Sequence, residues 1–339
     1  MVVKKLLDHD GSIKEIDKEG ALRIIDASTE EFHEIQEFCK KLTQKNFDKN
    51  ISLLYPGADF PSISITGSKC EMNCQHCNHH YLETMIAADT PQKLIKICKN
   101  LDKGGANGCL ISGGFDKEAK LPLEKFLNAL REIKTKTSLI LNLHTGLITK
   151  KLAEKLGEIG IDIVSFDITG DNYILNNVYK IDKSIEDYKK SLNWLLQSKI
   201  KKIVPHICIG LNPDNKLSEY LSLSIIKGIE PELIVLIAFI PTKNTPMEST
   251  PPPNSNDISR IVCLTRLMFP RSEISLGCMR PKKGRSKIEI EKKAFDSGIT
   301  RMVLPSRKTI NYITSNQYKV VKYNCCCGVS LENLGKLSI

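Results

Sequence analysis

The chain has 339 residues, of which 41% are hydrophobic and 26% are charged, as is ordinary for a globular protein with a large core. This composition excludes wholly disordered and fibrous classes. The formal net charge of +10 arises from lysines scattered along the chain rather than gathered in one block. Because no DNA-binding or RNA-binding motif accompanies them, we expect no nucleic-acid partner.

The N-terminal apolar run ends at Leu7 and acidic residues follow it, which is unlike a signal or transit peptide. No apolar run approaches the roughly 20 residues that a membrane-spanning helix needs. We therefore expect a cytoplasmic protein without a membrane partner. Twelve cysteines in that compartment indicate metal binding or catalysis rather than a disulfide framework.

Apolar residues in the first part of the chain, 12–50, follow a helical period, which predicts an N-terminal helical extension. After Pro61 the pattern changes to short apolar runs that alternate with amphipathic segments, as in βα units. The predicted strands are Ser62–Thr66, Gly108–Ser112, Ser138–Leu143, Asp162–Asp167, Ile203–Ile209, Leu233–Phe239, Glu273–Leu276 and Met302–Leu304. The predicted helices between and after them are Pro91–Leu101, Leu123–Ile133, Lys151–Ile159, Ile185–Gln197, Leu217–Lys227, Asn256–Met268, Ile288–Ser297 and Arg307–Asn316.

This alternation predicts an α/β fold of the (β/α)8 TIM-barrel type. A partial barrel of six units is the alternative, because the last two predicted strands are short. We expect the N-terminal helical extension at 1–60, the barrel at 61–316 and a C-terminal, cysteine-bearing tail at 317–339. The segment 241–257, rich in Pro, Asn, Ser and Thr, is expected to be a long loop at the barrel mouth, where such barrels place their chemistry.

Three cysteines follow the first predicted strand with the spacing C-x3-C-x2-C, namely Cys70, Cys74 and Cys77. Three thiolates on one loop can bind three irons of a [4Fe–4S] cluster and leave the fourth iron open for another ligand. The alternative is a zinc site completed by His79 or His80. Zinc sites more often combine a C-x2-C pair with a second, distant pair, so the sequence favours the cluster.

This spacing, directly after the first strand of a βα series, resembles the signature of the radical S-adenosylmethionine (SAM) superfamily. The resemblance implies a radical SAM barrel in which the open iron binds SAM, and one electron cleaves SAM to a 5′-deoxyadenosyl radical. It also implies that His76, just before the third cysteine, packs near the adenine. By the same resemblance, Ser112, Gly113 and Gly114 contact the amino group of SAM.

In place of the glutamate that the family has after these glycines, this chain has Phe115 and Asp116, so backbone carbonyls or Asp116 would make the contact. A plain glycine turn is the alternative. His144 and Asp167 stand at the C-terminal ends of the third and fourth predicted strands, where polar side chains of a barrel face the site, and we expect both to contact the cofactors. For His206, in the fifth strand, a buried core histidine is an equal alternative.

Isolated cysteines are more often small buried apolar residues than ligands. Cys39, Cys98 and Cys263 lie on helical apolar faces and are expected in the core. Cys109 begins its strand, which places it away from the chemistry. Cys208 stays open between the two interpretations.

Cys278 differs because it ends the seventh predicted strand beside Arg280. The triplet Cys325, Cys326 and Cys327 differs too, since three adjacent side chains diverge and their neighbours are polar. This context predicts surface thiols that bind metal. We expect an auxiliary [4Fe–4S] cluster held by Cys278 and two or three of the tail cysteines.

A second resemblance rests on a set of motifs: FPSISITGSKCEMNCQHCNHHYLETM, ISGGFD, LHTGL, LGCMRPKKGR, VLPSR and the terminal cysteine run. Together they resemble the archaeal-type two-component lipoyl synthases, relatives of biotin synthase. The N-terminal C-x4-C-x5-C of single-chain lipoyl synthases is missing. So are the cluster cysteines of biotin synthase in the third and fifth strands, where Leu143 and Val204 or their neighbours stand.

This resemblance implies sulfur insertion into an octanoyl chain on a lipoyl carrier protein, with the auxiliary cluster as sulfur source. It also implies a homologous second subunit and an electron donor such as ferredoxin. An acidic carrier would match the positive net charge. One alternative is another radical SAM enzyme of the biotin synthase or methylornithine synthase type, whose tail cysteines need not bind a cluster. Another is a non-catalytic iron–sulfur or zinc protein.

Overall fold

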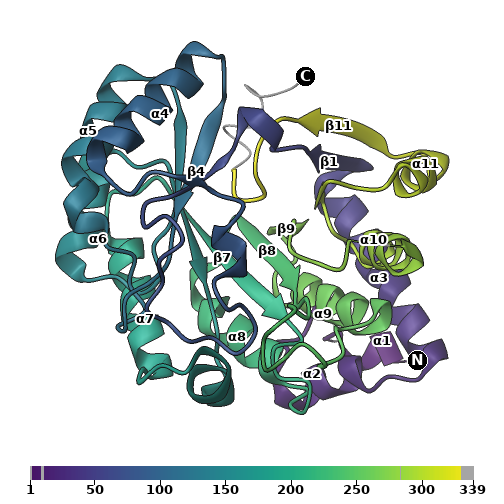
Figure 1. Ribbon diagram of the computed structural model, residues 1–339. Coiled ribbons are helices and arrows are strands. Elements are labelled where there is room, and N and C mark those ends of the chain that lie inside the picture. Colours follow the sequence, from purple (N-terminus) through teal and green to yellow (C-terminus); the bar gives the residue numbers. More distant parts are fainter. Residues whose placement is uncertain (1, 9–10, 283, 330–339) are drawn as a thin grey trace. The chain divides into compact units, whose positions relative to one another are not determined.

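The computed structural model describes residues 2–8, 11–282 and 284–329. Within these ranges strands and helices alternate along the chain (Figure 1). The backbone divides into two compact units. Each unit combines several stretches of chain. The first consists of Met1–Leu54, Ile207–Ile240 and Pro251–Lys322, and the second of Tyr55–His206, Pro241–Thr250 and Tyr323–Ile339.

The second unit is built on parallel strands. They are β2 (Ser62–Ser64), β3 (Ile86–Ala87), β4 (Gly108–Ser112), β5 (Ile140–His144), β6 (Ile163–Asp167) and the first part of β7 (Lys202–Ile209). Their hydrogen-bonded order is β7-β6-β5-β4-β2-β3. The helices of this unit are α4 (Pro91–Lys103), α5 (Leu127–Lys136), α6 (Lys150–Ile159) and α7 (Ile185–Gln197), with short 3-10 turns at His80–Leu82 and Leu123–Phe126 and a π-helical turn at Ile174–Tyr179. Consecutive helices pack side by side along one side of the strands, coloured blue to teal in Figure 1.

Short polar side chains define where these helices begin. Thr90, Thr149 and Ser184 precede α4, α6 and α7, and each side chain accepts a hydrogen bond from a backbone N–H of the first turn. The Asp187 carboxylate in turn accepts a hydrogen bond from the Ser184 backbone N–H, which completes a capping box. Gly160 ends α6 in the left-handed conformation that glycine adopts without strain. The chain therefore turns from strand to helix at positions that the sequence marks locally.

The first unit has its own strands and helices. Its strands are β1 (Asn50–Leu54), the end of β7, β8 (Leu233–Ala238), β9 (Glu273–Leu276), β10 (Arg301–Val303) and most of β11 (Lys319–Tyr323). The order there is β11-β1-β10-β9-β8. The helices are α1 (Val2–Lys5), α2 (Lys18–Ile25), α3 (Thr29–Phe47), α8 (Ser218–Ile226), α9 (Ser255–Met268), α10 (Gly284–Asp296) and α11 (Arg307–Ser315), with a 3-10 turn at Lys227–Ile229. A further 3-10 turn, Gly57–Asp59, belongs to the second unit.

Helix α9 attaches the N-terminal helices to this unit. The Arg260 guanidinium donates hydrogen bonds to the carbonyls of Ile24 (2.9 Å) and Ala27 (2.8 Å), and it lies over the Phe32 ring. Cation–π contact and hydrogen bonding together satisfy a side chain that would otherwise be costly to bury. Helices α2 and α3 thus pack against α9.

All eight predicted strands and all eight predicted helices are present, which confirms the α/β class with parallel strands alternating with helices. Three strands were missed. β1 lies in the stretch expected to be helical, β3 has only two residues, and β11 lies in the tail, where no periodicity is visible. The division into 1–60, 61–316 and 317–339 stays a prediction, and the last ten residues of that tail, 330–339, lie outside the described residues.

Candidate active site

The three cysteines of the C-x3-C-x2-C motif lie in the second unit, in the loop 65–85 between β2 and β3, called here the motif loop. Its backbone folds on itself, because the N–H of Cys77 donates to the Cys74 carbonyl and the N–H of His80 donates to the Cys77 carbonyl. His79 has a positive φ of 62°. All three cysteines are partly exposed. The loop therefore presents three thiols from one compact turn.

The turn after β4 anchors the first part of the motif loop. The N–H of Gly114 donates to the Thr66 hydroxyl over 2.7 Å, and the Phe115 carbonyl accepts from the Glu71 N–H (2.8 Å) and from the Cys70 thiol (3.7 Å). A Cβ on Gly114 would overlap the Lys69 carbonyl and lie 2.5 Å from the Cys70 Cα. Glycine is needed here because the backbone of the motif loop occupies the space of a side chain.

This contact gives Gly114 a packing role, which the sequence did not predict. Gly113 also packs closely against the motif loop, since a Cβ on it would be 2.9 Å from the Thr66 hydroxyl. Asp116 accepts the N–H groups of Glu118 and Lys120 on one carboxylate oxygen, which closes its own turn. The expected contacts of Ser112, Gly113 and Gly114 with the amino group of SAM stay a prediction.

The centre of the motif loop is held by the π-helical turn after β6. The Cys74 thiol donates to the Tyr179 carbonyl over 3.7 Å, and the Gln75 N–H donates to the Val178 carbonyl over 2.7 Å. The segment after β8 contacts the same place, because the Met247 N–H donates to the Gln75 carbonyl. The loop predicted at 241–257 thus reaches the motif, through residues 241–250 of the second unit.

The three thiols influence one another electrostatically. Burial, together with the neighbouring Cys77 and Cys70 thiols, raises the pKa of Cys74 to about 12. Burial is also the main cause of the raised pKa of Cys77. Thiolates crowded into a poorly hydrated space repel one another, and a bound metal cluster would relieve this because it binds thiols in the deprotonated form. The donor set therefore fits an iron–sulfur cluster.

The zinc alternative has less support. His79 Nε2 lies 3.1 Å from the Met72 carbonyl, and His80 is exposed and pairs with Glu83. Across residues 2–8, 11–282 and 284–329 there is no group of three His, Cys, Asp or Glu side chains arranged to hold one metal ion. The cysteines of a [4Fe–4S] cluster bind different irons, so they do not need to converge on one ion.

His76, between the second and third cysteines, has an unsatisfied polar atom. Its Nδ1 is buried without a hydrogen-bond partner, and its ring lies 5.7 Å from that of Tyr179. Burial lowers the pKa of His76 to about 4, which Asp167 only partly opposes, so the ring is neutral at pH 7. A buried nitrogen without a partner is costly, and a bound ligand with polar edges would satisfy it. His76 therefore fits the predicted position beside an adenine.

A polar strand face, defined by Asn142, His144, Ser165, Asp167 and His206, lies on β5, β6 and β7. Register aligns His144 with Ser165 and Asp167 with His206, and Asn142 is two residues before His144, so all five share one face. The His144 Nδ1 lies 3.7 Å from an Asp167 oxygen, and the rings of His144 and His206 meet edge to face at 5.1 Å. The structure thus brings His144 and Asp167 together.

The tail segment, residues 323–329, packs on this polar strand face. The Asn142 amide donates to the Cys326 sulfur over 3.2 Å, and the Cys327 sulfur lies 3.8 Å from His206 Nε2. Its start is fixed by a hydrogen bond from the Asn107 amide to the Asn324 carbonyl. The expectation of three surface thiols was wrong for Cys325, which is fully buried, whereas its two neighbours are partly exposed.

Asn142 was missed as a site residue. Its signal was available, because a polar side chain interrupts the apolar strand ILNLH two positions before His144 and therefore shares its face. His206 is buried and hydrogen-bonded, as the core alternative predicts, and it also contacts the tail. Its burial fits the core interpretation, and the functional one stays a prediction.

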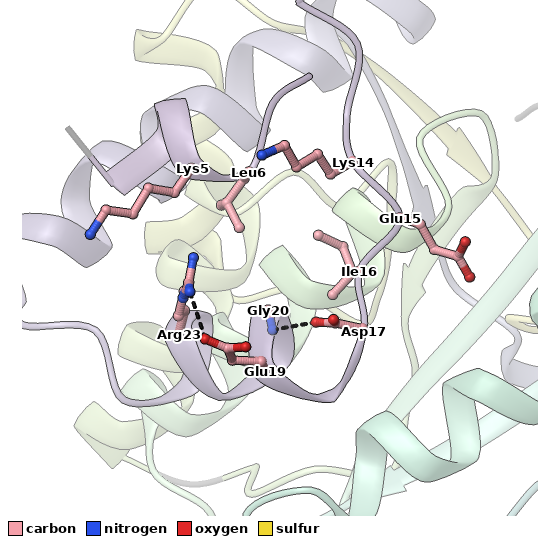
Figure 2. Close-up of a pocket in the computed structure, with 9 residues that line it drawn as sticks. All are labelled: Lys5, Leu6, Lys14, Glu15, Ile16, Asp17, Glu19, Gly20 and Arg23. Atoms are coloured by element: carbon pink, nitrogen blue, oxygen red, sulfur yellow. Dashed lines mark hydrogen bonds and ion pairs between the residues drawn. The ribbon is translucent and has the colours of Figure 1, made fainter. Parts of the chain in front are cut away.

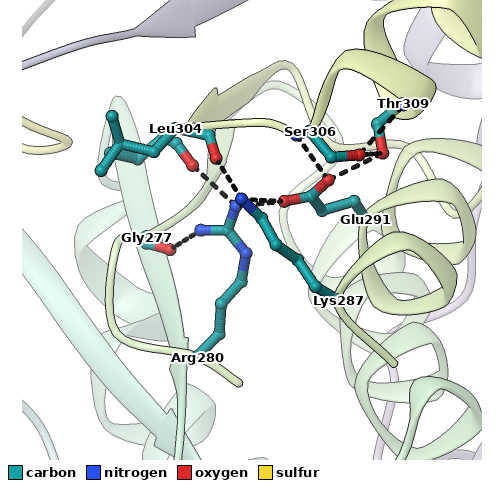
Figure 3. A network of polar contacts seen from close by, with 8 residues as sticks. Gly277, Arg280, Lys287, Glu291, Leu304, Ser306 and Thr309 are labelled. Carbon is teal, nitrogen blue, oxygen red and sulfur yellow. Dashed lines mark hydrogen bonds and ion pairs between the residues drawn. The ribbon is translucent and has the colours of Figure 1, made fainter. Parts of the chain in front are cut away.

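Cys278 lies in the first unit, so its predicted meeting with the tail cysteines stays a prediction. Figure 3 shows how the loop after β9 is held. The buried Arg280 donates to the carbonyls of Gly277 (2.6 Å) and Val303 (2.7 Å) and to Glu291 (2.7 Å). Burial alone would raise the pKa of Glu291, but hydrogen bonds from Ser306, Thr309 and Arg280 hold it below its usual value. Arg280 therefore anchors the loop that carries Cys278.

Four of the remaining five cysteines behave as core residues, and the fifth, Cys208, is partly exposed. Cys39, Cys98, Cys109 and Cys263 are fully buried, which confirms the expectation for the three helical ones. The Cys39 thiol donates to the Cys263 carbonyl inside the first unit. Their environment is apolar packing, as for most free cysteines.

A separate pocket lies in the N-terminal part of the first unit (Figure 2). It is lined by charged side chains such as Lys5, Lys14 and Asp17, and by Arg23, which pairs with Glu19. None of the predicted site residues lines it.

No described helix has the length and apolar character needed to cross a membrane.

The family model of the Radical SAM superfamily matches residues 64–221. The biotin synthase of Vesicomyosocius okutanii subsp. Calyptogena okutanii is 23% identical over 75% of this chain and 78% of its own length, and that of Buchnera aphidicola subsp. Acyrthosiphon pisum is 25% identical over 70% and 69%.

Two solved structures have a fold similar to that of this chain. Methylornithine synthase superposes with a TM-score of 0.67 at 15% identity, covering 94% of this chain and 97% of the other. The [FeFe]-hydrogenase maturase HydG superposes with a TM-score of 0.72 at 14% identity, covering 99% of this chain and 77% of the other. At these identities the likeness concerns the fold alone.

Proposed function

This chain belongs to the radical SAM superfamily, and from that premise we propose that it inserts sulfur into an octanoyl chain carried by a protein. In this proposal Cys70, Cys74 and Cys77 hold the [4Fe–4S] cluster whose open iron takes SAM. When bound, these groups supply the one-electron chemistry that removes a hydrogen atom from an unactivated carbon. The residues of the chain position the groups and limit the access of water.

Each part of the motif region has a role in this proposal. Thr66 and the Phe115 carbonyl fix the start of the motif loop, and the Tyr179 carbonyl fixes its centre. His76, neutral and with a buried nitrogen lacking a partner, would receive the adenine. His144 and Asp167, on the polar strand face, would contact the bound cosubstrate or the substrate. The neighbouring segment 241–250 would cover the loop.

The placement of the tail segment carries the sulfur-insertion part of the proposal. Cys326 and Cys327 contact Asn142 of β5 and His206 of β7, which correspond to the third and fifth strands predicted from sequence. Those strands carry the cluster cysteines in biotin synthase, whereas here Asn142 and His206 stand where the tail makes contact. The tail thus supplies thiols where the strands lack them, and we propose that these thiols hold an auxiliary iron–sulfur cluster that donates sulfur.

The substrate and partners follow from the same proposal. We propose an octanoylated lipoyl carrier protein as substrate, a homologous synthase subunit as partner, and a ferredoxin-like electron donor. The formal net charge of +10 favours an acidic carrier, because opposite charges speed the encounter of two proteins. Cys278 belongs to the first unit and the tail cysteines belong to the second.

A second candidate is a radical SAM enzyme that acts on a free small molecule, of the biotin synthase or methylornithine synthase type. The specific observation in its favour is the similarity to biotin synthases over about three quarters of the chain. This candidate keeps the motif loop and its cluster. It differs in the substrate, which would be a small molecule instead of an acyl chain on a carrier protein.

The proposal is tested by anaerobic incubation of the reconstituted protein with dithionite, SAM and an octanoylated carrier peptide. Mass spectrometry should show a gain of sulfur on the peptide together with 5′-deoxyadenosine. The homologous subunit is included in parallel, since it would be needed if two chains share the reaction. Formation of 5′-deoxyadenosine with no sulfur on the peptide in either mixture would reject the lipoyl proposal and retain the superfamily.

A further inference from the structure

His206 is placed in an unusual way for a core residue. Only 5% of the residue is exposed, its Nδ1 lies 3.0 Å from the Val204 carbonyl, and its Nε2 lies 3.8 Å from the Cys327 sulfur. One ring nitrogen is thus committed to the backbone of its own strand. The other faces a thiol that arrives from a segment 121 positions away in sequence.

The hydrogen bond to Val204 determines the state of the ring. A carbonyl oxygen only accepts hydrogen bonds, so Nδ1 must carry the proton and donate it. In the neutral ring Nε2 then has a lone pair, which points to the thiol. Histidines that bind metals almost always donate their other N–H to a carbonyl, a carboxylate or water in this manner. His206 therefore has the arrangement of a metal ligand.

The ring is also held in orientation by its neighbours. His144 meets it edge to face at 5.1 Å, and His144 itself lies 3.7 Å from Asp167. On the tail side, Gly328 packs closely, because a Cβ there would be 2.9 Å from both the Asn142 amide and the Ser165 hydroxyl. The tail backbone therefore lies directly on the polar strand face, with Cys326 and Cys327 next to it.

We propose that His206, through Nε2, is a ligand of the auxiliary iron–sulfur cluster beside Cys326 and Cys327. This inference rests on the proposed function, which supplies the cluster. Its consequence is a mixed cysteine and histidine ligand set. Replacing thiolate by neutral imidazole removes negative charge from a cluster and raises its reduction potential, as in clusters with histidine ligands.

The test isolates the auxiliary cluster in the full chain. The variant Cys70→Ala/Cys74→Ala/Cys77→Ala cannot hold the cluster of the motif loop, so iron that remains after anaerobic reconstitution reports the tail site. The protein is labelled with ¹⁵N-histidine, reduced with dithionite and studied by pulsed EPR without SAM, whose own nitrogen would interfere. We expect a nitrogen coupling that changes with the histidine isotope.

Two substitutions are then added to this background. His206→Cys offers a thiolate in place of the imidazole, so it should retain the iron, lose the nitrogen coupling and lower the reduction potential. The control is His33→Ala, which alters an exposed histidine of α3 and should leave the iron, the coupling and the potential unchanged. Thermal unfolding of each variant shows that the chain is folded.

The outcomes separate the two levels of the proposal. Retained iron with no histidine coupling, or a coupling that persists in His206→Cys, would overturn the role of His206 and leave the auxiliary cluster in place. A folded background variant that binds no iron would overturn the auxiliary cluster, and with it both this inference and the sulfur source of the proposed function.

Discussion

The motif loop and the tail segment each bring three cysteines to the second unit, but they are held by different kinds of contact. The motif loop is fixed mainly through backbone groups, such as the Phe115 and Tyr179 carbonyls and the N–H of Gly114. The tail segment lies on side chains, chiefly Asn142 and His206. Backbone that meets an added Cβ, as beside Gly114, can yield little, whereas side-chain ends, as beside Gly328, can shift.

This difference gives an expectation for function. Changes in the motif loop should remove every activity of the enzyme, because SAM cleavage precedes any further step. Changes in the tail should separate SAM cleavage from sulfur insertion. The following experiments test that contrast, beginning with the largest effect.

Replacement of Cys74 should have the largest effect. Cys74 is the central thiol of the motif, with a pKa raised to about 12 by burial and by its two neighbours, so a cluster is needed to hold it as thiolate. Cys74→Ala should reduce 5′-deoxyadenosine formation to background and lower the iron content by about four per chain. The control Cys98→Ala removes a buried core thiol and should retain cleavage at a cost of about 1 kcal/mol in unfolding free energy. Normal cleavage by Cys74→Ala would contradict the assignment of the motif.

Replacement of the tail cysteines should separate the two activities. Cys326→Ala and Cys327→Ala should retain SAM cleavage, lose sulfur insertion and lose the iron of the auxiliary cluster, because these sulfurs contact the polar strand face. Cys325→Ala is the matched control, since Cys325 is fully buried and should mainly contribute to packing. Iron analysis and mass spectrometry of the carrier peptide measure both effects. Equal iron loss in all three variants would show that burial does not distinguish the ligands.

Gly114→Ala should have an intermediate effect. Its Cβ would overlap the Lys69 carbonyl and press on Cys70, and neither backbone can yield without moving the motif loop. Overpacking of this kind costs typically 1–3 kcal/mol, and we expect about 3 kcal/mol here together with a strong loss of 5′-deoxyadenosine formation. Gly228→Ala is the control, because its Cβ meets nothing within 4 Å and its effect should stay within about 0.5 kcal/mol. Chemical denaturation and the cleavage assay compare the two variants, and equal behaviour would refute the role of Gly114.

Much of the fold could be predicted from sequence because its elements are marked locally. Apolar runs such as Leu233–Ala238 and caps such as Ser184 depend on neighbouring residues alone. β1 was missed for a physical reason. It is stabilised by pairing with β10, about 250 positions away, and not by an alternating pattern of its own. Strand pairing over such distances leaves no local signal.

The candidate site divides in the same way. The spacing of Cys70, Cys74 and Cys77 predicted that all three lie on one loop, and the structure confirms this placement. The contact of Cys326 with Asn142 joins residues 184 positions apart, and only the folded chain brings them together. The burial of Cys325 was not predictable either, because its polar neighbours in sequence concealed the packing around it.

Gly328→Ala should have the smallest effect and therefore gives the sharpest test of the contrast. Its Cβ would lie 2.9 Å from the Asn142 amide and the Ser165 hydroxyl, and these side-chain ends can shift more easily than the backbone beside Gly114. We expect a cost of about 1 kcal/mol in unfolding free energy, unchanged 5′-deoxyadenosine formation and a partial loss of sulfur insertion, since the tail would lift slightly from the polar strand face. Denaturation, the cleavage assay and the peptide assay are compared with Gly228→Ala. If Gly328→Ala impaired cleavage as strongly as Gly114→Ala, the tail segment and the motif loop would act as one unit, and side-chain contacts would not make the tail independent.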